Sequence, residues 1–291
     1  MNVPYQKIHV VINPSAGKDD AILNKLNRVF NKYGVDWEVS ITREFGDATR
    51  FARQAVAEGV DLVAGYGGDG TQMEIADGVM GSDIPMAILP GGTGNAMSFE
   101  LGVPHKLEQA AELICQSRNQ RKIDVVQIGE QHFMLRLYTG IEESEKTNRE
   151  DKDRLGNLAY VKDALKEIEH LPQANYRLSV DGQQIEQDGM FCLILNAGSI
   201  GGIDAHLTKQ ISISDGLADV FIVNRSLSSL GALASYALDI GASQAGVHHW
   251  QGREIRVAAD PHQTTWIDGE LYGPTPFTLT VIPKSVSVVV P

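Results

Sequence analysis

Residues 60–71, VDLVAGYGGDGT, decide the fold, because they join an apolar strand to a glycine-rich turn. Residues 84–95, IPMAILPGGTGN, repeat this pattern. Glycine lets the backbone turn sharply and bring amide N–H groups close to an anion. A helix that follows such a turn adds partial positive charge at its N-terminus. Asp69 places a carboxylate among these amides, where a divalent metal can bridge it to phosphate. The two turns therefore predict a nucleoside triphosphate site with magnesium.

Strand and helix patterns alternate over the first 122 residues. Residues 8–12 form a short apolar run that ends at Asn13, and residues 22–33 carry apolar side chains at helical period. Gly34 is placed to end that helix, and Asp47 is placed to cap the next one. This order predicts crossover units and a mostly parallel sheet. Ligands of such sheets bind at the carboxyl ends of the strands, where Asn13 and both glycine turns are expected.

Strand patterns with hairpin signals replace this alternation after residue 122. Asp181-Gly182 stands between two of these runs and is a favoured two-residue hairpin turn. Helical periodicity is plain only at 155–170 and 227–238, and residues 142–154 have the charge of a solvated segment. We therefore predict an α/β domain over 1–122 and a mainly antiparallel β domain over 123–291. The expected strands of the second domain are 123–128, 132–138, 176–180, 190–195, 217–223, 254–258 and 277–282.

The composition and charge argue against several classes of protein. The chain has 291 residues, a formal net charge of -12 and a pI near 5.1. This acidity argues against nucleic-acid binding through a basic face and against a strong attraction to anionic membranes. No apolar run is long enough to span a bilayer, and the N-terminus lacks a signal-peptide core. Cys115 and Cys192 lie in apolar segments, as buried free thiols do in a reducing compartment. We expect a cytoplasmic protein.

Two familiar phosphate-binding motifs are matched only in part. Gly65, Gly67 and Gly70 satisfy the dinucleotide fingerprint, but no carboxylate ends the following strand and the motif stands on the third strand–helix unit. A dehydrogenase is therefore disfavoured. Residues 13–18, NPSAGK, end like a P-loop, but Ile12 stands before them in place of the leading glycine. On spacing alone, this segment would be a plain turn between strand and helix.

The motifs are far more specific in combination. Residues 13–18, Thr42 with Gly46-Asp47-Ala48, the first glycine turn with Glu74, and the second glycine turn occur in this order. Further along come residues 101–104, Asp124, residues 196–198, 214–220 and 268–270. This combination resembles the diacylglycerol kinase catalytic-domain family, which includes bacterial lipid kinases and sphingosine kinases. The resemblance covers nearly the whole chain. It implies a Rossmann-like nucleotide domain and a β-sandwich domain, with the active site between them.

The resemblance also implies a role for each matching residue. Asp69 would act through a catalytic magnesium and its waters, with Asp124 supporting that network. Glu270 or Asp268 would receive the proton of a lipid hydroxyl. A structural magnesium would bind Asp215 and backbone oxygens of Ser212 and Leu217. The implied cofactors are ATP and Mg²⁺, and the acceptor is a lipid alcohol reached by transient peripheral contact with a membrane; a homodimer stays open. The ATP site would consist of Asn13, Pro14, Ser15, Ala16, Gly17, Thr42, Gly67, Gly68, Asp69, Gly70, Thr71, Thr93, Gly94 and Asn95.

Several alternatives stay open at this point. Ala96 stands where many bacterial members have Asp, and Met73 where Asn is common, so a catalytically weak or non-catalytic relative is one alternative. A soluble kinase related to NAD kinases is another, because those enzymes share the Gly-Gly-Asp-Gly turn. Asp268-Gly269 also has the composition of a hairpin turn. Asp215 has an equally simple reading as a loop carboxylate that accepts backbone N–H groups.

Overall fold

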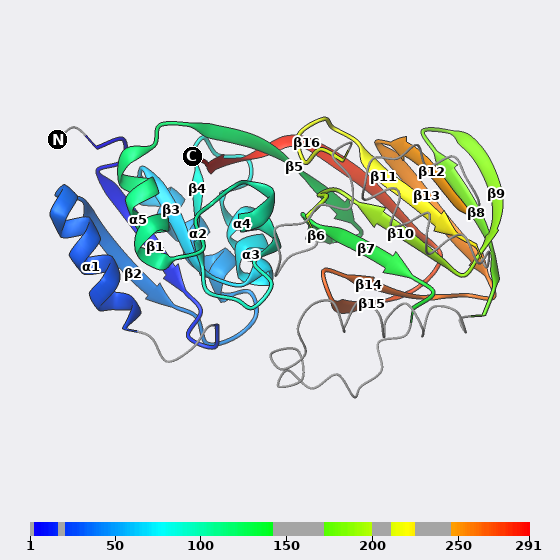
Figure 1. Ribbon diagram of the computed structural model, residues 1–291, viewed down its shortest axis with the longest axis horizontal. Coiled ribbons are helices and arrows are strands. Elements are labelled where there is room, and N and C mark those ends of the chain that lie inside the picture. Colours follow the sequence, from blue (N-terminus) through cyan, green and yellow to red (C-terminus); the bar gives the residue numbers. More distant parts are fainter. Residues whose placement is uncertain (1–2, 17–20, 142–171, 200–210, 225–245) are drawn as a thin grey trace. The chain divides into compact units, whose positions relative to one another are not determined.

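A computed structural model describes residues 3–16, 21–141, 172–199, 211–224 and 246–291, and the chain divides into two compact units (Figure 1). The first unit contains Met1–Asp124 and Lys284–Pro291, and the second contains Val125–Pro283. Strand β5 (Gln120–Ile128) leads from the first unit into the second, and β16 (Phe277–Val289) leads back. The sequence predictions for Gly17 and for residues 142–154, 155–170 and 227–238 lie outside the described residues.

The first unit is built on a parallel sheet, as the alternation of patterns predicts. Its strands lie in the order β2-β1-β3-β4, and the end of β16 pairs with β4 in parallel through Val288 and Met86. Val10 of β1 lies between Val39 of β2 and Ala64 of β3, which fixes the register. The strands are β1 (Lys7–Ile12), β2 (Asp36–Ile41), β3 (Leu62–Gly67) and β4 (Met86–Pro90). The helices are α1 (Ile22–Tyr33), α2 (Asp47–Ala57), α3 (Asp69–Val79), α4 (Ala96–Glu100) and α5 (Leu107–Gln116).

Apolar burial on both faces explains this sheet. Every residue of β3 and β4 is buried, as a parallel strand between two layers of helices requires. Helix α1 packs with α5, and α2 packs with α3. Helix α1 ends as predicted at Gly34, whose φ of 70° is a left-handed conformation that glycine adopts without a Cβ clash.

The second unit is an antiparallel β-sandwich, which confirms the predicted fold class. One sheet has the order β16-β13-β8-β9, with β5 and β6 joined through β16, and the other has the order β12-β11-β10-β7-β14-β15. Apolar side chains of both sheets form one core, with Phe133, Tyr176, Ile194 and Val220 among its fully buried members. The remaining strands are β6 (Gln131–Phe133), β7 (Arg136–Thr139), β8 (Ala174–Val180), β9 (Gln183–Gly189), β10 (Phe191–Leu195), β11 (Ala218–Val223), β12 (Val247–Gly252), β13 (Glu254–Asp260), β14 (Thr264–Ile267) and β15 (Glu270–Pro274).

The prediction of buried free thiols is confirmed. Cys115 and Cys192 are free and buried, and burial raises the pKa of each thiol to about 12. Both sulfurs are therefore protonated at neutral pH and poor nucleophiles or metal ligands. Among the helices that the structure describes, none combines the length and apolar character needed to cross a membrane.

Candidate nucleotide site

The carboxyl ends of β1, β3 and β4 bring the three predicted phosphate-binding segments of the first unit together. The N–H of Asn13 donates to the Tyr66 carbonyl, and the N–H of Gly91 donates to the Gly67 carbonyl. The Asn13 side chain makes two further bonds. Its Nδ2 donates to Thr71 Oγ1 at 3.0 Å, and its Oδ1 accepts the Ser15 N–H at 3.0 Å. Asn13 thus ties its own turn to the first glycine turn.

Glycine is required at two positions because the chain packs closely there. A Cβ at Gly92 would lie 2.6 Å from the Gly68 Cα, so the two glycine turns touch backbone to backbone. A Cβ at Gly67 would lie 2.5 Å from the Thr71 side chain. Gly70 differs, since a Cβ there would meet nothing within 4 Å. Packing within the described chain therefore gives no reason for glycine at position 70.

Helix α3 presents its N-terminus at this edge of the sheet. Gly68 is the N-cap and no side chain caps the helix. The first intrahelical bond runs from the Gln72 N–H to the Gly68 carbonyl at 3.1 Å. The N–H groups of the first turn precede that bond, so they have no intrahelical acceptor and carry the positive end of the helix dipole. Such a helix start can bind an anion.

The Asp69 carboxylate is directed at the second glycine turn. Its Oδ2 accepts the Ala96 N–H at 3.0 Å and its Oδ1 accepts the Met97 N–H at 3.0 Å, so it caps the start of α4. Ala96 therefore takes part through its backbone N–H. Each oxygen of an ionised carboxylate has further lone pairs. Because Mg²⁺ is usually held by one or two carboxylates together with substrate phosphates, a single half-buried carboxylate beside a helix start that can bind phosphate fits that ion.

Among the residues of the second turn that are predicted to bind ATP, Asn95 has a structural role. Asn95 has a φ of 45° and closes the turn on itself, since its Oδ1 accepts the Gly92 N–H at 2.9 Å and its Nδ2 donates to the Gly92 carbonyl. Thr93 and Gly94 lie exposed at the tip between them. The turn is therefore held by Asn95, and its tip is open to a ligand.

Thr42 and the start of α2 complete this edge of the sheet. Thr42 is buried, and its N–H donates to the Ile12 carbonyl. The sequence interpretation of Asp47 as the cap of α2 is wrong, because Asp47 is the first helical residue and its Oδ2 accepts the Arg43 N–H at 2.8 Å. The helix start is instead satisfied by Glu74, whose Oε2 accepts the N–H groups of Gly46 at 2.9 Å and Ala48 at 3.0 Å.

The environments of these two carboxylates shift their pKa values in opposite directions. Burial raises the pKa of Glu74 above its ordinary value, although the backbone donors of Ala48 and Gly46 oppose the shift. The Arg43 N–H and the Arg50 side chain lower the pKa of Asp47. Sequence reasoning assigned no role to Glu74, because its partners lie 28 and 26 residues earlier and no local pattern reveals such a contact.

Asp124 accepts a backbone donor from β16. It is fully buried on β5, and its Oδ1 accepts the Lys284 N–H at 2.7 Å. Among the described residues, neither Asp69 nor Asp124 belongs to a cluster of three or more metal-ligating side chains. Support of a catalytic metal by Asp124 stays a prediction from the resemblance.

The predicted base residues of the second unit lie on a hairpin. Asp268 and Gly269 form the two-residue turn between β14 and β15, with φ values of 49° and 91°. The Asp268 Oδ1 accepts the Arg136 N–H at 2.8 Å, while Glu270 begins β15 and is exposed. Asp181, in the predicted turn between β8 and β9, makes the same kind of bond as Asp268, since its Oδ1 accepts the Arg253 N–H at 3.0 Å.

In the loop predicted to bind a structural metal, two side chains accept backbone N–H groups of the same loop. The Asp215 Oδ1 accepts the Leu217 N–H at 3.0 Å, and the Ser212 Oγ accepts the Ser214 N–H at 3.4 Å. These bonds match the simpler reading of Asp215 as a loop carboxylate. Binding of a metal by Ser212, Asp215 and Leu217 stays a prediction.

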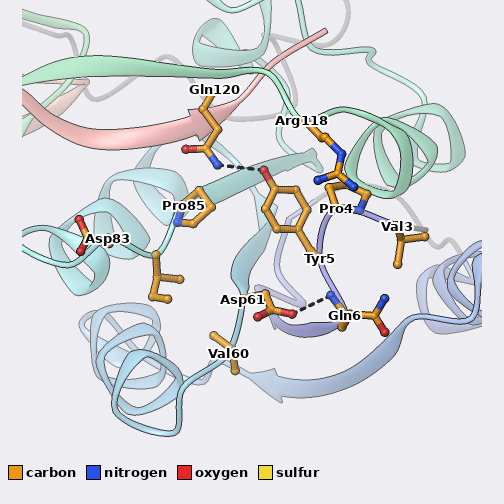
Figure 2. Close-up of a pocket in the computed structure, with 11 residues that line it drawn as sticks. Val3, Pro4, Tyr5, Gln6, Val60, Asp61, Asp83, Pro85, Arg118 and Gln120 are labelled. Atoms are coloured by element: carbon orange, nitrogen blue, oxygen red, sulfur yellow. Dashed lines mark hydrogen bonds between the residues drawn. The ribbon is translucent and has the colours of Figure 1, made fainter.

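A cavity of about 550 Å³ lies at the opposite edge of the parallel sheet, before the strands begin (Figure 2). Asp61 Oδ2 accepts the Gln6 N–H at 2.7 Å there, and Gln120 Nε2 donates to the Tyr5 hydroxyl at 3.1 Å. These bonds attach the segment before β1 to the starts of β3 and β5. The cavity is thus separate from the glycine turns, which follow the strand ends.

Comparison with known proteins identifies the family. Residues 7–128 match the diacylglycerol kinase catalytic domain, and residues 136–290 match the YegS C-terminal NAD kinase beta sandwich-like domain. The first match contains both glycine turns, and the second contains the Asp268 hairpin. This pairing defines a two-domain kinase. The chain belongs to the diacylglycerol kinase catalytic-domain family and is a kinase.

Individual relatives agree with this assignment. A Staphylococcus aureus (strain MSSA476) protein named as a putative lipid kinase is 30% identical over 261 residues, which cover 86% of this chain and 85% of the relative. A Synechocystis protein without an assigned function is 28% identical over 97% of this chain and 70% of its own length. The crystal structure of a putative diacylglycerol kinase from Bacillus anthracis has a TM-score of 0.83 and 26% identity, covering 100% of this chain and 99% of that one.

Proposed function

We propose that the protein transfers the γ-phosphoryl group of ATP, with Mg²⁺, to the hydroxyl of a lipid such as a diacylglycerol or a sphingoid base. The observation that carries this proposal is the open space at Gly70, because nothing in the described chain accounts for glycine there. A phosphate approaching the first turn of α3 does account for it. The donors of that turn, the adjacent Asp69 carboxylate and the family assignment all support the same ligand.

In phosphoryl transfer, the protein mainly positions the reacting groups and stabilises the charge that develops on the phosphates. In this proposal the N–H groups of α3 and of the turn at Thr93 hold the phosphates, and Asn13 fixes the turns around them. Asp69 would hold Mg²⁺, which neutralises charge on the β- and γ-phosphates when bound. The ATP-binding role belongs to residues 1–122, and the lipid site, the base Glu270 and a structural metal at Asp215 belong to residues 123–291. We further propose that the enzyme is cytoplasmic and meets its lipid by transient contact with a membrane surface.

Substitutions at two glycines should separate folding from phosphate binding. Gly92→Ala should lower both the melting temperature and the affinity for ATP, because its Cβ would meet the Gly68 backbone at 2.6 Å. Gly70→Ala should leave the melting temperature unchanged or higher, since alanine favours helix by up to about 1 kcal/mol. Its Cβ should still weaken ATP binding at least about tenfold, or 1.4 kcal/mol. Thermal unfolding and ATP titration of both variants test this, and full ATP affinity in Gly70→Ala would contradict the proposed phosphate position.

A transfer assay tests the proposed reaction itself. Purified protein, radiolabelled ATP and Mg²⁺ should label a lipid presented in mixed micelles, with the product identified by mass spectrometry. NAD is the matched soluble acceptor, because the second domain also matches a sandwich described as NAD kinase-like. Labelling of NAD alone would favour the soluble-kinase alternative. ATP binding without transfer to any extracted lipid would favour a non-catalytic relative.

A further inference from the structure

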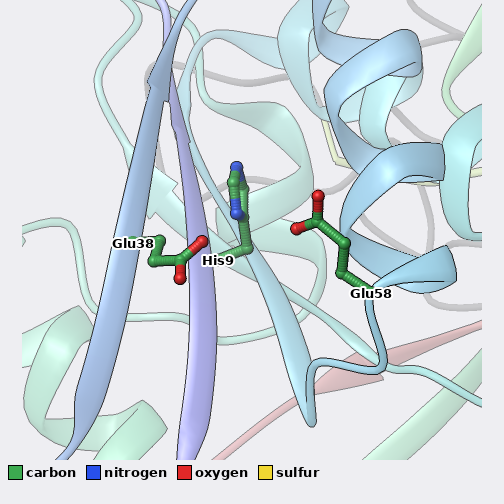
Figure 3. Close-up of side chains that lie close together, drawn as sticks. All are labelled: His9, Glu38 and Glu58. Carbon is green, nitrogen blue, oxygen red and sulfur yellow. The ribbon is translucent and has the colours of Figure 1, made fainter.

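His9, Glu38 and Glu58 lie together in the first unit, in a place that the proposed kinase reaction does not use. His9 in β1 pairs in register with Glu38 in β2, and Glu58 follows the last residue of α2. One ligand atom of each side chain lies within 4.8 Å of the others. Figure 3 shows the imidazole between the two carboxylates, both of which turn toward it.

His9 supplies an observation independent of the acidic pair. The residue is only 7% exposed, and its Nε2 lies 3.0 Å from Ser40 Oγ. Its other ring nitrogen, Nδ1, is buried and has no hydrogen-bond partner among the described residues. A buried polar atom without a partner is costly and calls for an explanation. With Nε2–H donating to Ser40, Nδ1 carries a lone pair, which is the tautomer of a metal-ligating histidine whose other nitrogen is held by a hydrogen bond.

We propose that His9, Glu38 and Glu58 form a binding site for a divalent transition-metal ion of the zinc type. One imidazole nitrogen and two carboxylate oxygens supply three ligands, and water completes the coordination. Imidazole favours zinc-type ions, whereas Mg²⁺ prefers an all-oxygen environment. The ion also compensates two carboxylates that face each other across a buried ring.

The spacing suits such an ion after small side-chain movements. Zinc binds nitrogen and carboxylate oxygen at about 2.0–2.2 Å, so two ligands of one ion lie at most about 4.3 Å apart. In a tetrahedral arrangement two such ligands lie about 3.4 Å apart, so the present limit of 4.8 Å requires the ligand atoms to approach one another by up to about 1.4 Å. Glu38 and Glu58 are exposed and can provide this shift by rotation about their side-chain bonds.

Burial of the His9 ring favours its neutral, metal-binding form. Burial is the largest influence and lowers the pKa of His9, while Glu38 and Glu58 act in the opposite direction and Lys7 acts with burial. His9 stands four residues before Asn13, which is roughly 13 Å along an extended strand. An ion here would brace β1, β2 and the end of α2, and it would not contact phosphate bound at the glycine turns.

Cobalt(II), a spectroscopic substitute for zinc, tests the site in the full-length protein. Chelator-treated protein is titrated with Co²⁺ in excess Mg²⁺, so that the proposed site at Asp69 is filled with Mg²⁺. We expect one Co²⁺ per chain to give visible absorption bands that Zn²⁺ abolishes. Glu38→Gln and Glu58→Gln should each weaken Co²⁺ binding at least about tenfold, as loss of even an outer-shell partner does. Both residues are exposed, so these variants should fold normally.

Asp36→Asn is the matched control, because Asp36 is exposed, lies two residues before Glu38 on the same strand and changes charge by the same amount. It should bind Co²⁺ like the native protein. The proposal is overturned if the native protein shows no saturable Co²⁺ spectrum. It is also overturned if binding is unaffected by both glutamate substitutions, which would assign the ion to other histidines.

Discussion

Replacing Asp69 by alanine should abolish phosphoryl transfer. In the proposed mechanism this side chain supplies the negative charge beside the N–H donors of α3, and a metal held there contributes several kcal/mol of charge stabilisation in the transition state. Its loss should lower kcat by about 10³-fold or more, since each 1.36 kcal/mol is a factor of ten. The measurement is the initial rate of transfer from radiolabelled ATP at saturating ATP and lipid. Turnover near that of the native protein would refute the metal-binding role.

The structural role of Asp69 has to be separated from this chemistry. Its carboxylate accepts the N–H groups of Ala96 and Met97, and removing such a cap typically costs about 1 kcal/mol of stability. Asp69→Asn keeps one acceptor oxygen for that cap and loses the charge, so it should lose less stability than Asp69→Ala and still be inactive. Asp83→Asn removes an equal charge at the opposite edge of the sheet and should leave transfer unchanged. A fully active Asp69→Asn would reduce the role of Asp69 to capping.

The parts of the fold that depend on local patterns were predictable from the sequence. The run 62–67 is apolar throughout because β3 is buried on both faces, and Gly34 ends α1 because it adopts the left-handed conformation needed there. After residue 122, strand patterns with hairpin signals replace the alternation of strand and helix patterns, which likewise reflects a change from crossover units to hairpins. In each case the cause acts within a few residues along the chain or repeats along an element, so it leaves a periodic or compositional signal.

Contacts between distant segments were not predictable in this way. Asp47 has the composition of a helix cap, yet Glu74 from α3 accepts the N–H groups at the start of α2. In the sequence, His9 is one residue within an apolar run. Only the pairing of β1 with β2 places it beside Glu38. The Asp-Gly pairs at 181 and 268 look identical in sequence and form the same kind of turn. Sequence alone therefore could not decide which carboxylate of the 268–270 segment is available for catalysis.

Glu270→Gln should lower kcat far more than it changes the KM for ATP. The Asp268 carboxylate accepts the Arg136 N–H, just as Asp181 accepts the Arg253 N–H in a turn with no proposed catalytic role. Glu270 is exposed at the start of β15, so we propose it as the general base. Loss of a general base costs about 10²–10⁴-fold in rate. Steady-state kinetics with a micellar lipid and varied ATP provide the measurement, with thermal unfolding to confirm that the variant folds.

The two Asp-Gly turns supply the control for this assignment. Asp268→Asn and Asp181→Asn both keep an oxygen that can accept the neighbouring N–H, and Asn tolerates the left-handed backbone at each site. Both should lower stability slightly and by similar amounts, because each replaces a charged acceptor by a neutral one. If Glu270 is the base, Asp268→Asn should lose less than about tenfold in kcat, well short of the loss expected for a missing base. A loss of 10²-fold or more in Asp268→Asn, with an active Glu270→Gln, would transfer the role to Asp268, because asparagine keeps the turn bond and lacks the basic carboxylate.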